Sequence, residues 1–166
     1  ECSSGFRETF GGLHKKYKVY PDIAVFGKSI ANGIPLTTVI GTNEIMKDSN
    51  KSFISSTFWT DNLGPASALH TLEQMEKYKS WKKISLLGKE IKKAWKFLAK
   101  KYHLSIKIYG LDAMPSFQFI SLKNQYYKNF LTQEMLKKNI LATNTVYCCL
   151  QHNKYLKIYF KELEKI

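Results

Sequence analysis

The segment from Pro21 to Pro35, PDIAVFGKSIANGIP, constrains this chain more than any other part of it. Within it, Ile23–Phe26 is a short apolar run, β-branched and aromatic and bounded by Pro-Asp and Gly, which predicts a buried strand. A single lysine, Lys28, follows this strand between Gly27 and an Asn-Gly turn. A neutral lysine amine at the end of a buried strand can form an imine with a carbonyl group. The pattern therefore predicts a chemical role for Lys28, and it suits pyridoxal phosphate chemistry.

The composition is that of a globular protein. The chain has 166 residues, of which 44% are hydrophobic and 14% aromatic, enough for one core or two smaller ones. No apolar run approaches the roughly 20 residues that a membrane helix needs, so we expect no membrane partner. The first residues, ECSSGFRE, are neither a signal peptide nor a transit peptide, and there is no initiator Met. We expect a chain that begins inside a longer protein.

The net charge of +13 comes almost entirely from lysine, because Arg7 is the only arginine. Proteins that read nucleic acids usually rely on arginine for bidentate contacts with bases and phosphates. We interpret the lysine excess as a general compositional bias, and we do not expect nucleic acid as a partner. A face that binds polyanions remains the alternative interpretation.

The three cysteines, Cys2, Cys148 and Cys149, form no CxxC spacing and no even set that would predict a disulfide framework. We therefore expect no metal site, and the pattern indicates a reducing, cytoplasmic compartment.

The apolar pattern divides the chain into two parts. It predicts a second strand over Leu36–Ile40, a Ser/Thr-rich loop over 52–62, and helices over 65–78 and 80–101. From Leu104 onward the pattern reads strand, strand, helix, strand, helix, over residues 104–109, 117–122, 126–138, 146–150 and 153–166. An α+β unit of this kind predicts a domain boundary near Lys79, between parts 1–79 and 80–166.

The helices carry more detailed expectations. Polar residues that precede apolar periodic runs are expected to be N-caps, namely Asn43, Ser80 and Asn153. The helix over 65–78 has an apolar residue at every third position, which predicts a buried stripe formed by Ala66, Leu69, Leu72 and Met75. The helix over 80–101 has its apolar residues at spacings of three and four, which predicts a buried face formed by Trp81, Ile84, Leu87, Ile91, Trp95, Leu98 and Tyr102.

Four stretches of the sequence resemble the class III aminotransferases, which are fold-type-I pyridoxal phosphate enzymes. They are ECSSGFR (1–7), PDIAVFGKSIANGIP (21–35), VIGTNEIM (39–46) and SSTFWTDNLG (55–64). Within the family the resemblance is strongest to glutamate-semialdehyde aminomutases and related aminotransferases. The order and spacing of the four stretches agree with the family over residues 1–72. The remainder of the chain fits the family's small C-terminal domain more loosely. The resemblance implies an α/β fold: the C-terminal part of the cofactor-binding major domain, followed by a small α+β domain.

The resemblance also assigns roles to single residues. Lys28 would be the Schiff-base lysine, and it would later move a proton between the substrate and the cofactor. Thr57 would contact the cofactor phosphate of the neighbouring subunit of a homodimer. Cys2 would pack under the pyridine ring, and Ser3 would lie near the 3-oxygen of that ring. Gly33 would let the backbone approach closely at the subunit boundary.

The implied activity is transfer of an amino group, by an aminotransferase or an aminomutase, from a small-molecule amino donor to a keto or semialdehyde acceptor. Decarboxylases and racemases share the scaffold, so the reaction type is less specific than the cofactor. The family's aspartate partner of the ring nitrogen precedes the position of Glu1, and its phosphate loop lies further upstream. We therefore expect this chain to be inactive by itself.

Other interpretations remain open. A non-catalytic basic scaffold would use the lysines between Lys77 and Lys101 to bind an acidic partner or nucleic acid. Arg7 is expected to form a structural ion pair near the Gly-rich turn, with a carboxylate clamp as its alternative. The histidines lack partners at catalytic spacing and are expected to be structural.

Overall fold

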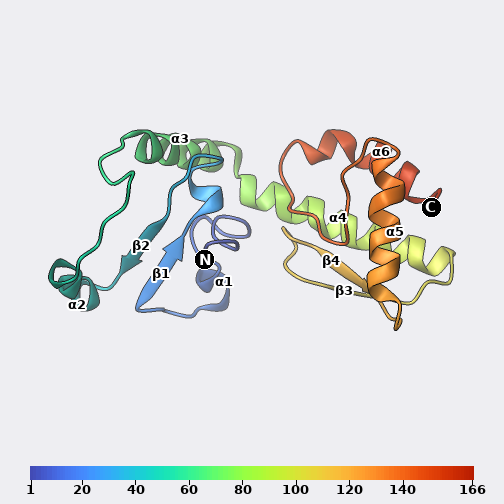
Figure 1. Cartoon of the computed structure of the whole chain (residues 1–166), viewed down its shortest axis with the longest axis horizontal. Coiled ribbons are helices and arrows are strands. Elements are labelled where there is room, and N and C mark those ends of the chain that lie inside the picture. Colours follow the sequence, from blue (N-terminus) through green and yellow to red (C-terminus); the bar gives the residue numbers. More distant parts are fainter. The chain divides into compact units, whose positions relative to one another are not determined.

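The computed structural model of the protein describes residues 1–166. The chain folds into two compact units, Glu1–Lys82 and Lys83–Ile166, whose elements are labelled in Figure 1. The division falls in the first turn of helix α4 (Ser80–Lys101), close to the link between α4 and the preceding helix α3 (Leu63–Tyr78). Each unit has its own hydrophobic core.

The first unit is built on a pair of short antiparallel strands, β1 (Ile23–Phe26) and β2 (Thr38–Gly41). The register runs from Ile23 opposite Gly41 to Phe26 opposite Thr38. The prediction of a strand over Ile23–Phe26 is confirmed, whereas the second strand begins at Thr38 rather than Leu36, because the pairing with β1 ends there. The shorter elements of this unit are α1 (His14–Tyr17), η1 (Lys28–Ile30), α2 (Asn43–Met46) and η2 (Lys47–Lys51).

The core of the first unit gathers around the end of β1. Its buried residues are Ala24, Phe26, Ile30, Ala31 and Ala68. Ala24 and Phe26 point to the same face because side chains alternate along a strand. Helix α3 joins the core through Ala68, and the Ser67 hydroxyl donates a hydrogen bond of 2.8 Å to the carbonyl of Ala31. The lysine-bearing turn η1 is therefore fixed between a strand and a long helix.

The stripe predicted for α3 is buried only in part, because Leu72 and Met75 are half-buried. Ala66 and Leu69 are exposed, and the residues of α3 that are buried are Gly64 and Ala68. Small side chains allow a close approach here, since a Cβ at Gly64 would lie only 3.2 Å from Leu36 Cδ1. The buried face of α3 therefore begins with small residues and includes only the second half of the predicted stripe.

The three predicted N-caps are displaced by one or two positions. Thr42 and Gln151 occupy the N-cap positions of α2 and of α6 (His152–Leu163), so Asn43 and Asn153 lie inside their helices. Ser80 is the first residue of α4, and its buried hydroxyl has no hydrogen-bond partner. Displacements of one or two residues at helix ends are ordinary, because the final turns fray.

The second unit combines α4 with the antiparallel strands β3 (Ile106–Tyr109) and β4 (Ser116–Phe119), followed by α5 (Asn124–Leu136) and α6. The strand predicted over 146–150 does not form. A single bridge joins Thr145 to Ser116, and Val146 N–H and Cys148 N–H donate to the carbonyls of Pro115 and Ala113. The segment 110–115 that faces it is a turn and not a strand, so no ladder can extend along it.

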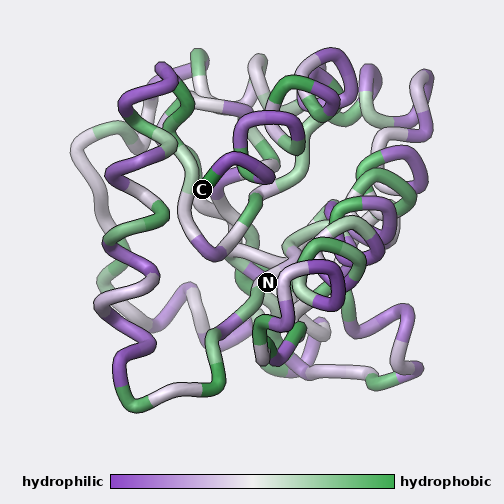
Figure 2. Tube along the Cα trace, turned by 90° about the vertical axis from the view of Figure 1, so that its right-hand side faces the viewer, coloured by the Kyte–Doolittle hydropathy of each residue, from purple (hydrophilic) through white to green (hydrophobic).

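The predicted buried face of α4 is confirmed at its centre. Ile84, Leu87, Ile91 and Trp95 are buried, while Tyr102 at the end of the face is 47% exposed. The same separation is visible in Figure 2, where apolar and hydrophilic residues lie on different sides of the helical coils. None of the helices combines the length and the hydropathy needed to span a bilayer.

Candidate active site

Lys28 lies immediately beyond the buried end of β1. Phe26 and Gly27 are buried, whereas the Lys28 side chain is exposed. The cause is a sharp change of backbone direction: Gly27 is extended, with φ −162°, and Lys28 has φ 45°. Left-handed backbone is uncommon for residues other than glycine and clusters at functional sites. The only lysine between Pro21 and Pro35 therefore lies exposed, directly after a strand of the core.

The Lys28 amine contacts Ser3. Lys28 Nζ donates a hydrogen bond to the Ser3 hydroxyl oxygen, although the two residues are separated by 25 positions in the sequence. The structure therefore brings together two of the four predicted site residues.

The N-terminal turn that carries Ser3 is held in place on both sides. Arg7 Nε donates a hydrogen bond of 2.7 Å to the Ser3 carbonyl oxygen, and Gly5 N–H donates one of 2.9 Å to the Glu1 carbonyl oxygen. A Cβ at Gly5 would lie 2.7 Å from Phe26 Cδ1, so glycine allows the turn to rest on the last side chain of β1. The bond from Arg7 to Ser3 was not predicted from the sequence.

The Glu1 carboxylate anchors the same turn to α1. One of its oxygens accepts hydrogen bonds from His14 N–H at 3.0 Å and His14 Nδ1 at 3.3 Å, and the other accepts one from the Ser4 hydroxyl at 2.7 Å. Burial alone would raise the pKa of this carboxyl, but hydrogen bonds from the Leu13 and His14 backbone and from the Ser4 and His14 side chains outweigh it and lower the pKa to about 2. His14, for which the sequence offered no partner, thus has one in Glu1.

Cys2 lies beside the backbone that precedes Lys28. Its sulfur is 3.9 Å from the position that a Cβ at Gly27 would take, and Thr37 Oγ1 is 3.6 Å from the same point. Cys2 itself is exposed. The site therefore consists of an amine, a hydroxyl and a thiol around the end of β1, with the Thr37 hydroxyl as a neighbour that the sequence did not single out.

Thr57 stands apart from these residues. It is exposed in the loop between η2 and α3, and no hydrogen bond joins it to Cys2, Ser3 or Lys28. A turn closed by a 3.2 Å hydrogen bond from Trp59 N–H to the Ser56 carbonyl contains it. Within one chain, the structure does not unite Thr57 with the lysine.

The same loop exposes large apolar side chains. Phe53, Phe58 and Trp59 are 96%, 62% and 66% exposed. All three lie between η2 and α3, on the loop that carries Thr57.

The donor set fits a carbonyl-bearing group better than a metal. A primary amine, hydroxyl groups and a thiol surround the end of β1. No group of three or more His, Cys, Asp or Glu residues in the chain could hold a metal ion. An aldehyde cofactor that condenses with an amine is compatible with these residues.

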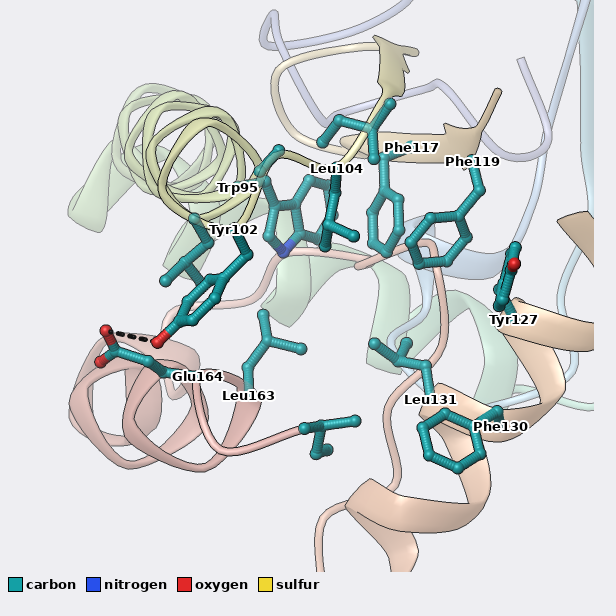
Figure 3. Close-up of a pocket in the computed structure, with 14 residues that line it drawn as sticks. Trp95, Tyr102, Leu104, Phe117, Phe119, Tyr127, Phe130, Leu131, Leu163 and Glu164 are labelled. Carbon is teal, nitrogen blue, oxygen red and sulfur yellow. Dashed lines mark hydrogen bonds between the residues drawn. The ribbon is translucent and has the colours of Figure 1, made fainter. Parts of the chain in front are cut away.

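A hollow lies entirely within the second unit. Its volume is about 320 Å³, and its wall is almost wholly aromatic and aliphatic, with Trp95, Phe117 and Leu131 among the lining residues (Figure 3). Glu164 is its only charged lining residue, and this carboxylate already accepts hydrogen bonds from Lys101 and Tyr102. None of the predicted site residues lines this cavity, so it is not the candidate active site.

The fold is that of part of a pyridoxal phosphate transaminase. The chain superposes with TM-score 0.90 on the pyridoxal phosphate internal aldimine form of the FumI protein of Sphingopyxis sp. MTA144, at 18% identity, over 99% of this chain and 40% of that one. An acetylornithine aminotransferase from Elizabethkingia anophelis gives a TM-score of 0.83 at 21% identity, over 99% and 43% of the two chains. The predicted α/β fold class is confirmed.

The sequence profile of the family "Aminotransferase class-III" matches residues 3–158. The chain therefore belongs to the class III aminotransferases, as its four sequence stretches had indicated.

Two curated relatives are similar over most of the chain. A 3-aminobutyryl-CoA aminotransferase from Cloacimonas acidaminovorans is 27% identical over 158 residues, which cover 92% of this chain and 38% of the relative. A glutamate-1-semialdehyde 2,1-aminomutase from Saccharolobus islandicus is 25% identical over 157 residues, which cover 89% of this chain and 37% of the relative. The chain thus spans less than half the length of the relatives it matches.

Proposed function

We propose that the protein is a pyridoxal phosphate-dependent aminotransferase or aminomutase whose Schiff-base lysine is Lys28. Membership of the class III family and the names of the relatives support this activity. The observation that carries the proposal is local: a lysine in left-handed backbone follows the buried end of β1 and directs its amine to the Ser3 hydroxyl. The substrates would be a small-molecule amino donor and a keto or semialdehyde acceptor.

Pyridoxal phosphate, when bound, supplies an aldehyde that combines with an amine and a ring that withdraws electrons from the substrate carbon. Lys28 would hold the cofactor through Nζ, and its amine would later carry the proton at the substrate carbon. Cys2 and Ser3 would contribute further contacts, because they lie beside Gly27 and Lys28.

A homodimer is part of the proposal. Thr57 would serve the cofactor phosphate of the partner subunit, which is compatible with its exposure and its separation from Lys28 in one chain. The exposed Phe53, Phe58 and Trp59 on the same loop supply the apolar surface that such an interface needs.

Because the chain spans only 38% of the 3-aminobutyryl-CoA aminotransferase, we propose that activity requires the part of the protein that corresponds to the remaining length. All three cysteines are free, which supports a reducing, cytoplasmic compartment.

The proposed function is tested by trapping the lysine. The intact protein is mixed with pyridoxal phosphate, reduced with borohydride and digested, and the modified peptide is identified by mass spectrometry. We expect the label on Lys28 and its loss in Lys28→Arg. The exposed Lys47, from the same unit, serves as the matched control in Lys47→Arg. Label scattered over surface lysines, with Lys28 unmodified, would overturn the proposal.

One observation favours the alternative of a basic binding module. The second unit contains 16 lysines against five acidic residues, whereas the first contains ten basic and eight acidic residues. The charge is thus concentrated outside the unit that carries Lys28. Binding of the intact protein to heparin or duplex DNA, measured between low and high salt, tests this function, since phosphate and sulfate contacts weaken steeply with salt. Absence of binding at low salt would remove the alternative.

A further inference from the structure

We propose that Ser3 is the positioning residue of Lys28: its hydroxyl holds the free lysine amine at the end of β1, ready to combine with the cofactor carbonyl. This inference rests on the proposed function of Lys28. It differs from the contact with the cofactor ring that the family resemblance implies for Ser3, because the partner here is the amine of this chain itself.

The hydrogen bond is the only one that the Ser3 side chain makes in the chain. A lysine amine stands on a flexible four-carbon stem and samples many rotamers when nothing holds it. Reactions of a flexible group accelerate when it is confined near the geometry of attack. A hydroxyl suits this task because it is uncharged and can release the amine, which a carboxylate paired with an ammonium would resist.

The short serine side chain can hold the amine only if its own backbone is fixed. Arg7 Nε supplies one restraint, through its 2.7 Å hydrogen bond to the Ser3 carbonyl. The Glu1 carboxylate supplies another, because it accepts hydrogen bonds from His14 in α1. The packing of Gly5 against Phe26 places the same turn on the last side chain of β1. The lysine backbone is fixed as well, because η1 is tied to α3 by the bond from Ser67 to Ala31.

The arrangement acts before and after each reaction cycle. While Lys28 is free, Ser3 confines Nζ beside Gly27. When the amine condenses with a carbonyl and water is released, the hydrogen bond to Ser3 is lost. It can form again once the incoming amine has displaced Lys28. Ser3 therefore sets how quickly Lys28 combines with the cofactor carbonyl, which we call the loading of Lys28. Ser3 contributes through Lys28 and not by direct chemistry.

The experiment measures loading of the lysine and not turnover. Intact wild-type protein, Ser3→Ala, Ser3→Thr and Ser4→Ala are freed of cofactor and mixed with pyridoxal phosphate. The reaction is stopped with borohydride at intervals, and the fraction of modified Lys28 peptide gives the loading rate. Ser4 is the matched control, because its hydroxyl faces Glu1 and not Lys28. Thermal denaturation of each variant reports on folding.

We expect Ser3→Ala to slow loading of Lys28 about fivefold, because the amine loses its confinement. Ser3→Thr keeps the hydroxyl and should restore the rate to within about twofold of wild type by the same argument. Ser4→Ala should load at the wild-type rate, because the turn keeps its hydrogen bonds from Arg7 and His14.

The outcomes separate this inference from the proposed function. If Lys28 is labelled in the wild type but Ser3→Ala loads as fast, the inference alone is overturned. It is also overturned if Ser3→Thr fails to restore the rate, or if Ser4→Ala is slowed equally, since either result indicates disruption of the turn. If the wild-type protein shows no label on Lys28, the proposed function fails and the inference fails with it.

Discussion

The carbonyl oxygen of Asp112 lies 1.6 Å from the position that a Cβ would take at Gly88. Helix α4 and the turn after β3 are therefore in direct backbone contact at this glycine. Lys92, one turn further along α4, holds the same turn by hydrogen bonds from Nζ to the Gly110 carbonyl at 2.8 Å and to Asp112 Oδ1 at 3.0 Å. The second unit depends on this contact, because Ala113, next to Asp112, is fully buried in its core.

Gly88→Ala should destabilise the second unit by about 3 kcal/mol, because backbone atoms cannot yield as a flexible side chain can. The gain of about 1 kcal/mol in helix propensity from alanine would not offset this cost. Urea unfolding followed by circular dichroism measures the change. Gly64→Ala is the matched helical control, since its Cβ would meet the movable end of Leu36 at 3.2 Å. Equal stability of the two variants would contradict the contact.

The indole of Trp95 donates a hydrogen bond of 2.9 Å to the Tyr159 hydroxyl. Trp95 is 3% exposed, so Tyr159→Phe would leave a buried N–H without a partner. We expect a loss of about 1–3 kcal/mol in the free energy of unfolding. Tyr155→Phe, at a tyrosine that is 60% exposed, should change stability little. A Tyr159→Phe protein as stable as the Tyr155→Phe control would show that the bond contributes nothing.

The same tyrosine predicts an alkaline transition. Burial raises the pKa of Tyr159 from 10.0 to about 12, partly countered by the hydrogen bond from Trp95. The folded state therefore favours the neutral phenol, and this contribution to stability is complete below pH 10 and lost as the pH rises toward 12. We expect the stability difference between wild type and Tyr159→Phe to shrink across this range. Unfolding curves at several pH values measure it, and a constant difference would contradict the buried location.

Glu1 predicts an acid transition of the N-terminal turn. Its pKa is lowered from 4.5 to about 2, so its contribution is present above pH 4.5 and is lost as the pH falls toward 2. Glu1→Gln should accelerate hydrogen exchange of the His14 amide at neutral pH, with the effect disappearing at the acid end. Asp48→Asn is the control, because its ion pair with Lys51 is exposed and worth little. If the effect of Glu1→Gln does not change with pH, the carboxylate is not the anchor.

Local pattern was sufficient for the elements that lie entirely within one short segment. The strand Ile23–Phe26, the long helix α4 and its central buried residues follow from the periodicity of the residues themselves. The lysine after β1 was found in the same way. Its exposure was not, because the left-handed backbone of Lys28 depends on the turn and on the packing of η1 against α3.

Contacts between segments that are distant in the sequence could not be predicted from local pattern. Nothing in the sequence pairs Ser3 with Lys28 or Arg7 with the Ser3 carbonyl, since these contacts require the N-terminal turn to rest on Phe26. The segment after Thr145 has the composition of a strand, but it faces a turn and so forms only isolated hydrogen bonds. The start of the buried face of α3 was missed because Gly64 and Ala68 carry too little apolar surface to mark it.

Thr57 allows a test of the proposed dimer that needs no structure of the complex. Lys28→Ala lacks the amine, and Thr57→Ala lacks the hydroxyl proposed to serve the neighbouring site. In a mixed dimer, the Thr57→Ala subunit keeps Lys28 and receives Thr57 from the Lys28→Ala subunit, so one site is complete. Random exchange between equal amounts of the two variants makes half of the dimers mixed, which restores about a quarter of the sites.

The intact variants are unfolded, mixed and refolded. The mixture is then washed at a pyridoxal phosphate concentration at which Thr57→Ala alone retains no cofactor. After borohydride reduction, the cofactor attached to Lys28 is measured by peptide mapping. We expect about a quarter of the wild-type label in the mixture. Each variant refolded alone is the control and should stay unlabelled. If Thr57 served the site of its own subunit, every mixed dimer would have two defective sites, and mixing would restore nothing.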